Sequence, residues 1–137
     1  MSRAWHLLRD ELARWRDAGR VADFWWRDDD AGQPVPALTR LTCLARDAQV
    51  PLALAVIPHD AASALVQAPG PLVSILQHGC DHRSRAGAGE KKTEFPAAEP
   101  VADALQRLAR GRAQIAGPQT LAVLVPPWNR VSSPGLL

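Results

Sequence analysis

Four short apolar runs, separated by segments with helical spacing, constrain the fold of this chain more than any other feature. The runs cover residues 21–26, 51–57, 71–77 and 121–125. Each has the length and the bulky apolar content of a buried strand. Strand-like runs that alternate with helical segments are typical of a parallel sheet covered by helices. The sequence therefore predicts an α/β domain with about four parallel strands.

The segments between these runs predict the covering helices. Apolar residues recur at helical spacing in segment 3–18, in the stretch that begins at Pro36 and in segment 97–116. Asp60 is placed to cap a shorter helix that continues through Val66. One connection, the polar segment that precedes the last helix, is longer than ordinary connections and forms either a lid or a surface loop.

Length, charge and cysteine content restrict the class of protein. The 137 residues suffice for one domain with its own core, and 47% of them are hydrophobic. The formal charge is +2 without a basic block, so nucleic acid is not an expected partner. No apolar stretch approaches the ~18 residues of a membrane span, and the first ten residues contain too much charge for a signal peptide. Cys43 and Cys80 have no framework spacing, which predicts reduced thiols and a cytoplasmic location.

Two of the chain's four histidines, His78 and His82, directly follow the third apolar run. If this segment forms a helical turn, both imidazoles project from one face, as two ligands of one metal ion must. If the segment stays extended, positions 78, 80 and 82 share a face, and Cys80 joins the set. A solvated polar loop explains an isolated pair of this spacing better than a metal site does. Partners elsewhere in the chain therefore decide the interpretation.

Polar residues also follow the first and the fourth apolar run. Residues 28–30 are three consecutive aspartates, and residues 128–130 are Trp-Asn-Arg. Adjacent carboxylates repel one another and require water, a cation or hydrogen-bond donors, although one of them could instead cap the next helix. The carboxyl ends of parallel strands share one rim, so these groups and the histidines are expected to meet. Two imidazoles and a carboxylate, with positions left for water, are typical of a catalytic zinc-type site.

These motifs resemble those of the polysaccharide deacetylase family, the chitooligosaccharide deacetylase homology domain of carbohydrate esterase family 4. The family's first motif is a strand that ends in an Asp-Asp pair, which Trp26–Ala31 matches. Its second is a His-x3-His pair followed by Ser or Thr, which His78, His82 and Ser84 match. Its third ends a strand in Pro and an aromatic residue, as Pro127-Trp128 does. The three motifs follow strands in the family's order and span most of the chain.

The resemblance implies a fold, a metal and roles for individual residues. The fold is an irregular (β/α) barrel of about seven strands, and residues 1–137 correspond to a single domain that contains its first half, without the C-terminal part. Asp29, His78 and His82 are the implied ligands of a divalent metal, most commonly Zn²⁺, and Asp28 is the implied general base. Because the acidic run has three members, a register shifted by one makes Asp29 the base and Asp30 the ligand.

The remaining expectations concern the segment after the fourth run. Trp128 and Arg130 are predicted to contact the substrate, and the backbone N–H of Trp128 is predicted to stabilise an oxyanion. The family usually has an Arg before the Pro-aromatic unit, braced against the catalytic Asp, where this chain has Val125 and Pro126. Arg27 or Arg130 is a candidate substitute. The family's later motifs, which include the histidine that supplies the general acid, have no counterpart.

Two functions follow from the resemblance. The first is a metal-dependent amide hydrolase, a deacetylase that removes an N-acetyl or similar acyl group from a sugar or a small amide. The second is a truncated, inactive relative that binds metal or carbohydrate or serves as an interaction module. A carbohydrate or N-acyl small molecule is the expected partner in solution, with no role for nucleic acid or membrane. Residues 121–125 lack a charged residue, so an open sheet edge there predicts homo-oligomers.

Overall fold

The computed structural model describes residues 2–133 and contains one four-stranded parallel sheet in the order β1-β2-β3-β4. The strands are β1 Arg27–Ala31, β2 Leu52–Val56, β3 Val73–His78 and β4 Thr120–Val125. The helices are α1 Arg3–Asp17, α2 Pro36–Ala48, α3 Ser63–Gln67 and α4 Val101–Gln114, with single 3-10 turns at η1 Pro58–Asp60 and η2 Pro127–Asn129. The structure confirms the predicted mixed α/β fold with parallel strands. Over the described residues the sheet is open, with β1 and β4 at its edges.

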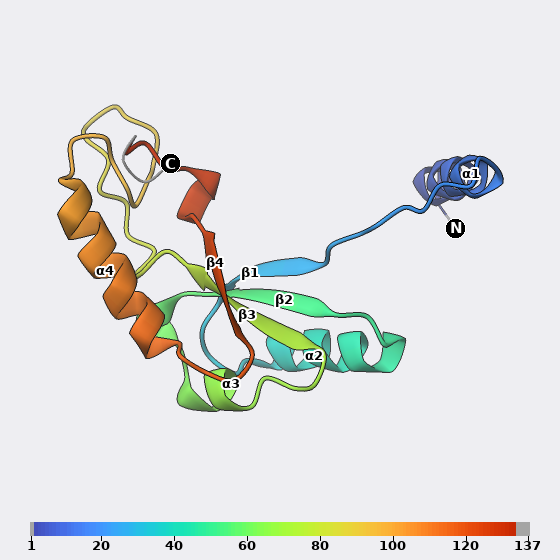
Figure 1. The fold of residues 1–137 in the computed structure, drawn as a ribbon, viewed down its shortest axis with the longest axis horizontal. Coiled ribbons are helices and arrows are strands. Elements are labelled where there is room, and N and C mark those ends of the chain that lie inside the picture. The colour runs from blue at the N-terminus through green and yellow to red at the C-terminus, as the bar shows by residue number, and fades with distance from the viewer. Residues whose placement is uncertain (1, 134–137) are drawn as a thin grey trace.

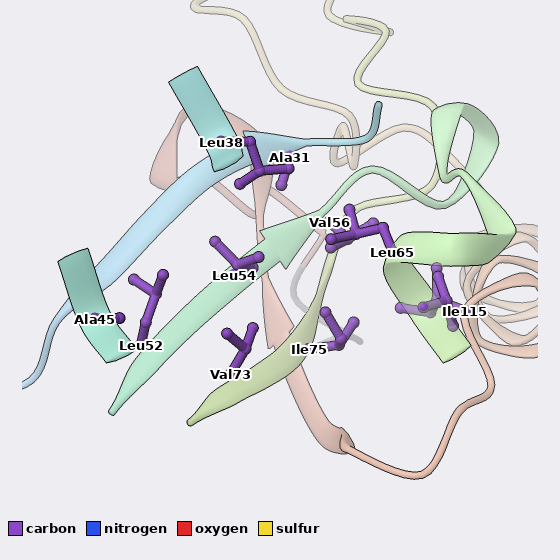
Figure 2. Close-up of a cluster of buried hydrophobic side chains, with 11 residues drawn as sticks. Ala31, Leu38, Ala45, Leu52, Leu54, Val56, Leu65, Val73, Ile75 and Ile115 are labelled. Atoms are coloured by element: carbon purple, nitrogen blue, oxygen red, sulfur yellow. The ribbon is translucent and has the colours of Figure 1, made fainter. Parts of the chain in front are cut away.

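One face of the sheet carries the hydrophobic core, which Figure 2 shows. Strand β2 alternates Leu and Ala, so Leu52 and Leu54 point to this face and lie 1% and 0% exposed. Helix α2 contributes Leu38 and Ala45, and α3 contributes Leu65 and Val66. Full burial of each large aliphatic side chain contributes roughly 1.5–3 kcal/mol, so this layer fixes the sheet on its helices.

The opposite face of the sheet has a smaller buried cluster. It consists of Ala53, Ala55, Leu76 and Val125, two of which are alanines from the alternating strand β2. His78, which is 3% exposed, is in phase with Leu76 in β3, and side chains two apart in a strand share a face. The candidate site therefore opens on this small-residue face at the carboxyl end of the strands.

The prediction of a strand at 21–26 is wrong, because β1 begins at Arg27 and includes the acidic run itself. Strand β2 supplies the reason. Its first residue after Leu52, Ala53, pairs with Arg27 and donates its N–H to the carbonyl of Trp26 at 3.0 Å. Only Leu52 of β2 precedes this pair, so β2 offers no run of residues with which the preceding apolar segment could pair. Val21, Phe24 and Trp25 are consequently exposed, and the segment is an extended connection.

Helix α1 confirms the predicted N-terminal helix but contacts little of the domain. None of its residues is buried, and Trp5 and Leu7 are each 59% exposed. Figure 1 shows α1 apart from the sheet, at the end of the extended connection. Within residues 2–133, no helix is both long enough and apolar enough to cross a membrane.

The other predicted helices are present with small differences at their ends. Helix α2 begins at Pro36 as expected, and α4 begins at Val101, after Pro100. Helix α3 begins at Ser63 with Ala62 as its N-cap, so Asp60 does not cap it. The reason is that Pro58 and the next two residues form the separate turn η1.

Candidate metal centre

Three side chains from β1, β3 and the segment after β3 converge at the carboxyl rim of the sheet. The Oδ1 atom of Asp30 lies 3.1 Å from Nε2 of His78 and 3.1 Å from Nε2 of His82. The three ligand-type atoms all lie within 4.8 Å of one another. The two imidazole rings are 5.1 Å apart and tilted by 40°, so their Nε2 atoms can face a common point. This is the arrangement that a shared cation requires.

His78 is fixed in orientation by the neighbouring strand. Its Nδ1 atom lies 2.9 Å from the carbonyl oxygen of Val125, the last residue of β4. A carbonyl only accepts hydrogen bonds, so Nδ1 carries a proton and Nε2 is the ring nitrogen that faces Asp30. Metal-binding histidines are typically oriented by such a bond from their other nitrogen. Burial of the ring, at 3% exposure, holds this orientation.

His82 is held by a ring contact and an unusual backbone conformation. Its imidazole lies 4.5 Å from the ring of Trp128, measured between ring centroids. Its φ is +53°, a left-handed conformation that residues other than glycine rarely adopt. Asp30, Trp128 and Asn129 share this property, at φ values of 62°, 54° and 51°. Backbone strain of roughly 1–3 kcal/mol per residue is thus concentrated at this rim, as it often is at functional sites.

A bulge in β1 determines which aspartate reaches the histidines. Asp28 pairs with Leu54 and Ala31 pairs with Val56, so β1 has one more residue than β2 between these two pairs. The extra residue lets Asp30, with its positive φ, turn toward the histidines. Because Asp28 and Leu54 are register partners, the Asp28 side chain lies on the face of the sheet that α2 covers.

Asp29 is paired with Arg27, its neighbour two positions earlier on the same face of β1. The Arg27 Nε atom lies 2.8 Å from Oδ1 of Asp29, and Nη2 donates a hydrogen bond to Oδ2 at 3.1 Å. Oδ1 is buried and receives no hydrogen bond of good geometry within residues 2–133. Both carboxylate oxygens of Asp29 therefore face the Arg27 guanidinium, which fixes the orientation of this side chain.

Asp28 has a different environment from the other two aspartates. Its pKa is raised, first by partial burial and then by the negative charges of Asp29 and Asp30. Together with Asp29, Asp30 and apolar residues such as Leu38 and Leu41, it lines a cavity of about 560 Å³. Of the three aspartates, the structure brings Asp30 to the two histidines, which is the arrangement of the shifted register.

The segment after β4 closes the rim. Trp128 is half-buried against His82, whereas the Arg130 guanidinium donates to the carbonyl of Lys92 at 3.1 Å. The Arg130 carbonyl in turn accepts a hydrogen bond from Thr93. The structure thus places Trp128 at the site and ties Arg130 to the segment before α4.

Cys80 lies between the two histidines but points away from them. Its Sγ atom donates a weak hydrogen bond to the carbonyl of Arg107 in α4, at 3.3 Å. Burial, followed by the charges of Glu94 and Asp81, raises the pKa of the thiol, so it is protonated near neutral pH. The thiol is therefore oriented for packing against α4 rather than for metal coordination.

The sequence analysis missed a buried segment within the connection from β3 to α4. Thr93, Glu94 and Phe95 are 1%, 0% and 0% exposed, so this part of the connection is neither a lid nor a surface loop. Glu94 accepts backbone hydrogen bonds from Cys80 and Asp81. Its pKa is raised, first by burial and then by the charge of Asp81. The only sequence signal was one acid directly before Phe95 at the end of a charged stretch.

Comparison with family models, curated proteins and solved structures finds no match to this chain.

Proposed function

We propose that this protein binds one divalent metal ion through Asp30, His78 and His82 and hydrolyses the amide bond of an N-acyl compound. The proposed substrate class is an N-acetylated sugar or a small N-acyl amide. The observation that carries the proposal is the convergence of one carboxylate oxygen and two imidazole Nε2 atoms, at 3.1 Å from the oxygen to each nitrogen. The resemblance of the three strand-end motifs to polysaccharide deacetylases supports the reaction class.

The donor set fits a zinc-type ion. Metal–ligand bonds of ~2.0–2.1 Å in a tetrahedral site separate neighbouring ligand atoms by ~3.3 Å, close to the separations from Asp30 to each histidine. Nitrogen and oxygen donors together suit Zn²⁺ better than a hard ion such as Mg²⁺. Three protein ligands leave coordination positions open, which is characteristic of catalytic rather than structural zinc sites.

The residues around the triad supply the remaining chemistry. When bound, a divalent ion supplies Lewis-acid chemistry that polarises a carbonyl and makes water more acidic. Asp29 acts as the general base, because it directly precedes the ligand Asp30 in the chain and Arg27 orients its carboxylate. The backbone N–H of Trp128 donates to the oxygen that develops negative charge, since Pro126 and Pro127 have no N–H to give.

This assignment corresponds to the shifted register of the family's Asp-Asp pair, with Asp29 as base and Asp30 as ligand. Arg27 then takes the place of the arginine that braces the catalytic aspartate in the family. The bulge in β1 supports this register, because it turns Asp30 toward the histidines while Asp28 stays on the α2 face. We further propose that the sheet is part of a (β/α) barrel. Its sequential strand order and the small side chains of Ala53 and Ala55 on the face opposite α2 and α3 support this.

The proposal is tested by acetate release from N-acetylated sugars and from a chromogenic anilide, with and without added zinc. We expect zinc-dependent turnover that falls by 10²–10⁴-fold in Asp29→Asn, as loss of a general base implies, with zinc binding retained. Asp28→Asn is the matched control, with the same change of charge in the neighbouring residue, and should retain most of the turnover. Stoichiometric zinc binding without turnover of any substrate would contradict the hydrolase assignment and indicate a metal-binding module instead.

A further inference from the structure

The Glu94 carboxylate is hydrogen-bonded to the backbone segment that joins the two histidines. Its Oε1 atom accepts the N–H of Cys80 at 2.9 Å and the N–H of Asp81 at 3.3 Å. Cys80 and Asp81 are two of the three residues between His78 and His82, and the Glu94 side chain is fully buried. One carboxylate oxygen therefore holds two consecutive backbone N–H groups at the centre of the ligand segment.

Other backbone groups of this segment are also held from the protein interior. The carbonyl of Gly79 accepts a hydrogen bond from Nε2 of Gln77 at 2.9 Å, and the carbonyl of Cys80 accepts one from the N–H of His59 at 3.0 Å. These donors come from β3 and from η1, whereas Glu94 comes from the connection before α4. Three separate parts of the fold thus hold the backbone between the two histidines. Among residues 2–133, Glu94 is the only charged side chain that accepts hydrogen bonds from the backbone N–H groups of this segment.

Burial of the Glu94 carboxylate is energetically unfavourable, and few other side chains could replace it at this position. Its Oε2 atom has no hydrogen-bond partner in the described part of the chain, and a buried carboxylate oxygen without a partner is destabilising. Arg107 partly compensates, with Nε 3.8 Å from Oε1 and Nη2 donating to the Glu94 carbonyl at 3.1 Å. Oε2 lies against Gly79, where a Cβ atom would come within 2.1 Å of it. A shorter or apolar side chain would avoid the cost but would leave two N–H groups without an acceptor.

We propose that Glu94 is a positioning residue that sets the backbone between His78 and His82 so that both Nε2 atoms reach Asp30. The inference rests on the proposed metal site. His82 needs such support because its φ of +53° is unfavourable for a residue with a side chain. Glu94 acts through the N–H groups of Cys80 and Asp81, to which its Oε1 atom is hydrogen-bonded.

Two measurements on Glu94→Ala and Glu94→Gln test the proposal. In zinc titrations, Glu94→Ala should weaken binding by about 10–100-fold, the range observed when groups that orient metal ligands are removed. Glu94→Gln retains an acceptor oxygen and should restore most of the affinity. In the metal-free protein, hydrogen exchange of the Cys80 and Asp81 amides should accelerate in Glu94→Ala. Thr93→Val is the matched control, because Thr93 is also buried but its hydroxyl is hydrogen-bonded to Arg130 and Phe95 instead of Cys80 and Asp81.

The outcomes separate this inference from the proposed function. Wild-type zinc affinity in a folded Glu94→Ala protein would overturn the positioning role while leaving the metal site intact. Failure of Glu94→Gln to restore affinity would overturn it as well, because burial rather than hydrogen bonding would then be the property that matters. If exchange of the two amides accelerates in Glu94→Ala but the wild-type protein binds no zinc, the role of Glu94 in the segment is supported and the metal site is refuted. If Glu94→Ala does not fold, Glu94→Asp, shorter by one methylene, serves for the same comparison.

Discussion

The Nδ1 atom of His78 lies 2.9 Å from the carbonyl oxygen of Val125, so the last residue of β3 is oriented by the last residue of β4. The two residues are also paired in the register of the sheet. Asp30 reaches the same histidine from β1, two strands away on the other side. The candidate metal site therefore depends on the assembled sheet, and a change that displaces either edge strand should weaken metal binding without altering a ligand.

Gly79→Ala should destabilise the protein strongly. An added Cβ would lie 2.1 Å from Oε2 of Glu94 and 2.7 Å from Pro127, and the residue has a φ of +61°. Gly89→Ala is a matched control, because Gly89 has a φ of +79° but nothing within 4 Å of its added Cβ. The control should lose roughly 1–2 kcal/mol from backbone strain alone. Gly79→Ala should lose a further 1–3 kcal/mol, roughly, from overpacking. Denaturant unfolding measures both, and equal losses would contradict the packing described around Glu94.

The ion pair between Glu99 and Arg107 should make stability depend on pH in the acidic range. Hydrogen bonds from Arg107 hold the pKa of Glu99 below its ordinary value, against a smaller opposing effect of burial. A carboxyl whose pKa is lowered by folding contributes stability above its unfolded pKa, near 4.5, and this contribution is lost as the pH falls through the lower folded value. The unfolding free energy of the wild type should therefore fall more steeply below pH 4.5 than that of Glu99→Gln. Parallel pH profiles from chemical denaturation would contradict this assignment.

Exposed apolar residues on β4 predict self-association. Leu121, Val123 and Leu124 are 48%, 39% and 38% exposed on an edge strand of the described sheet. Such edges pair readily when no charged residue blocks them. Sedimentation velocity at micromolar concentration should show dimers or larger species, and Val123→Lys should shift them toward monomer. Val50→Lys, at a comparably exposed valine before β2, should leave the distribution unchanged. A wild-type monomer at all concentrations would refute the prediction.

The parallel sheet was predictable because a strand that is buried on both of its faces has a continuous apolar sequence. The apolar run of β2 and the helical spacing after Pro36 identify elements whose position in the fold matches their local preference. The segment 21–26 shows where this reasoning fails. Its apolar residues are exposed, and strand pairing begins only at Arg27, since Ala53 is the partner that β2 supplies. Local composition cannot indicate where a neighbouring strand begins.

The histidine pair was predictable, but the choice of aspartate and the role of Glu94 were not. His78 and His82 carry a recognisable spacing at a strand end. The choice between Asp29 and Asp30 depends on a bulge, which inserts one residue without changing the run of identical side chains. Glu94 acts on backbone N–H groups, which have no sequence signature, and it lies in a connection whose composition resembles a solvated loop.

Zinc titration of the wild type, Asp30→Asn and Asp29→Asn tests whether Asp30, His78 and His82 together bind a divalent metal. We expect one equivalent of zinc in the wild type, with affinity reduced at least ~10-fold in Asp30→Asn, as loss of a ligand implies. Asp29→Asn, which changes the adjacent carboxylate by the same atoms, should retain the affinity. Unchanged affinity in Asp30→Asn, or a loss confined to Asp29→Asn, would contradict the site that the bulge in β1 creates.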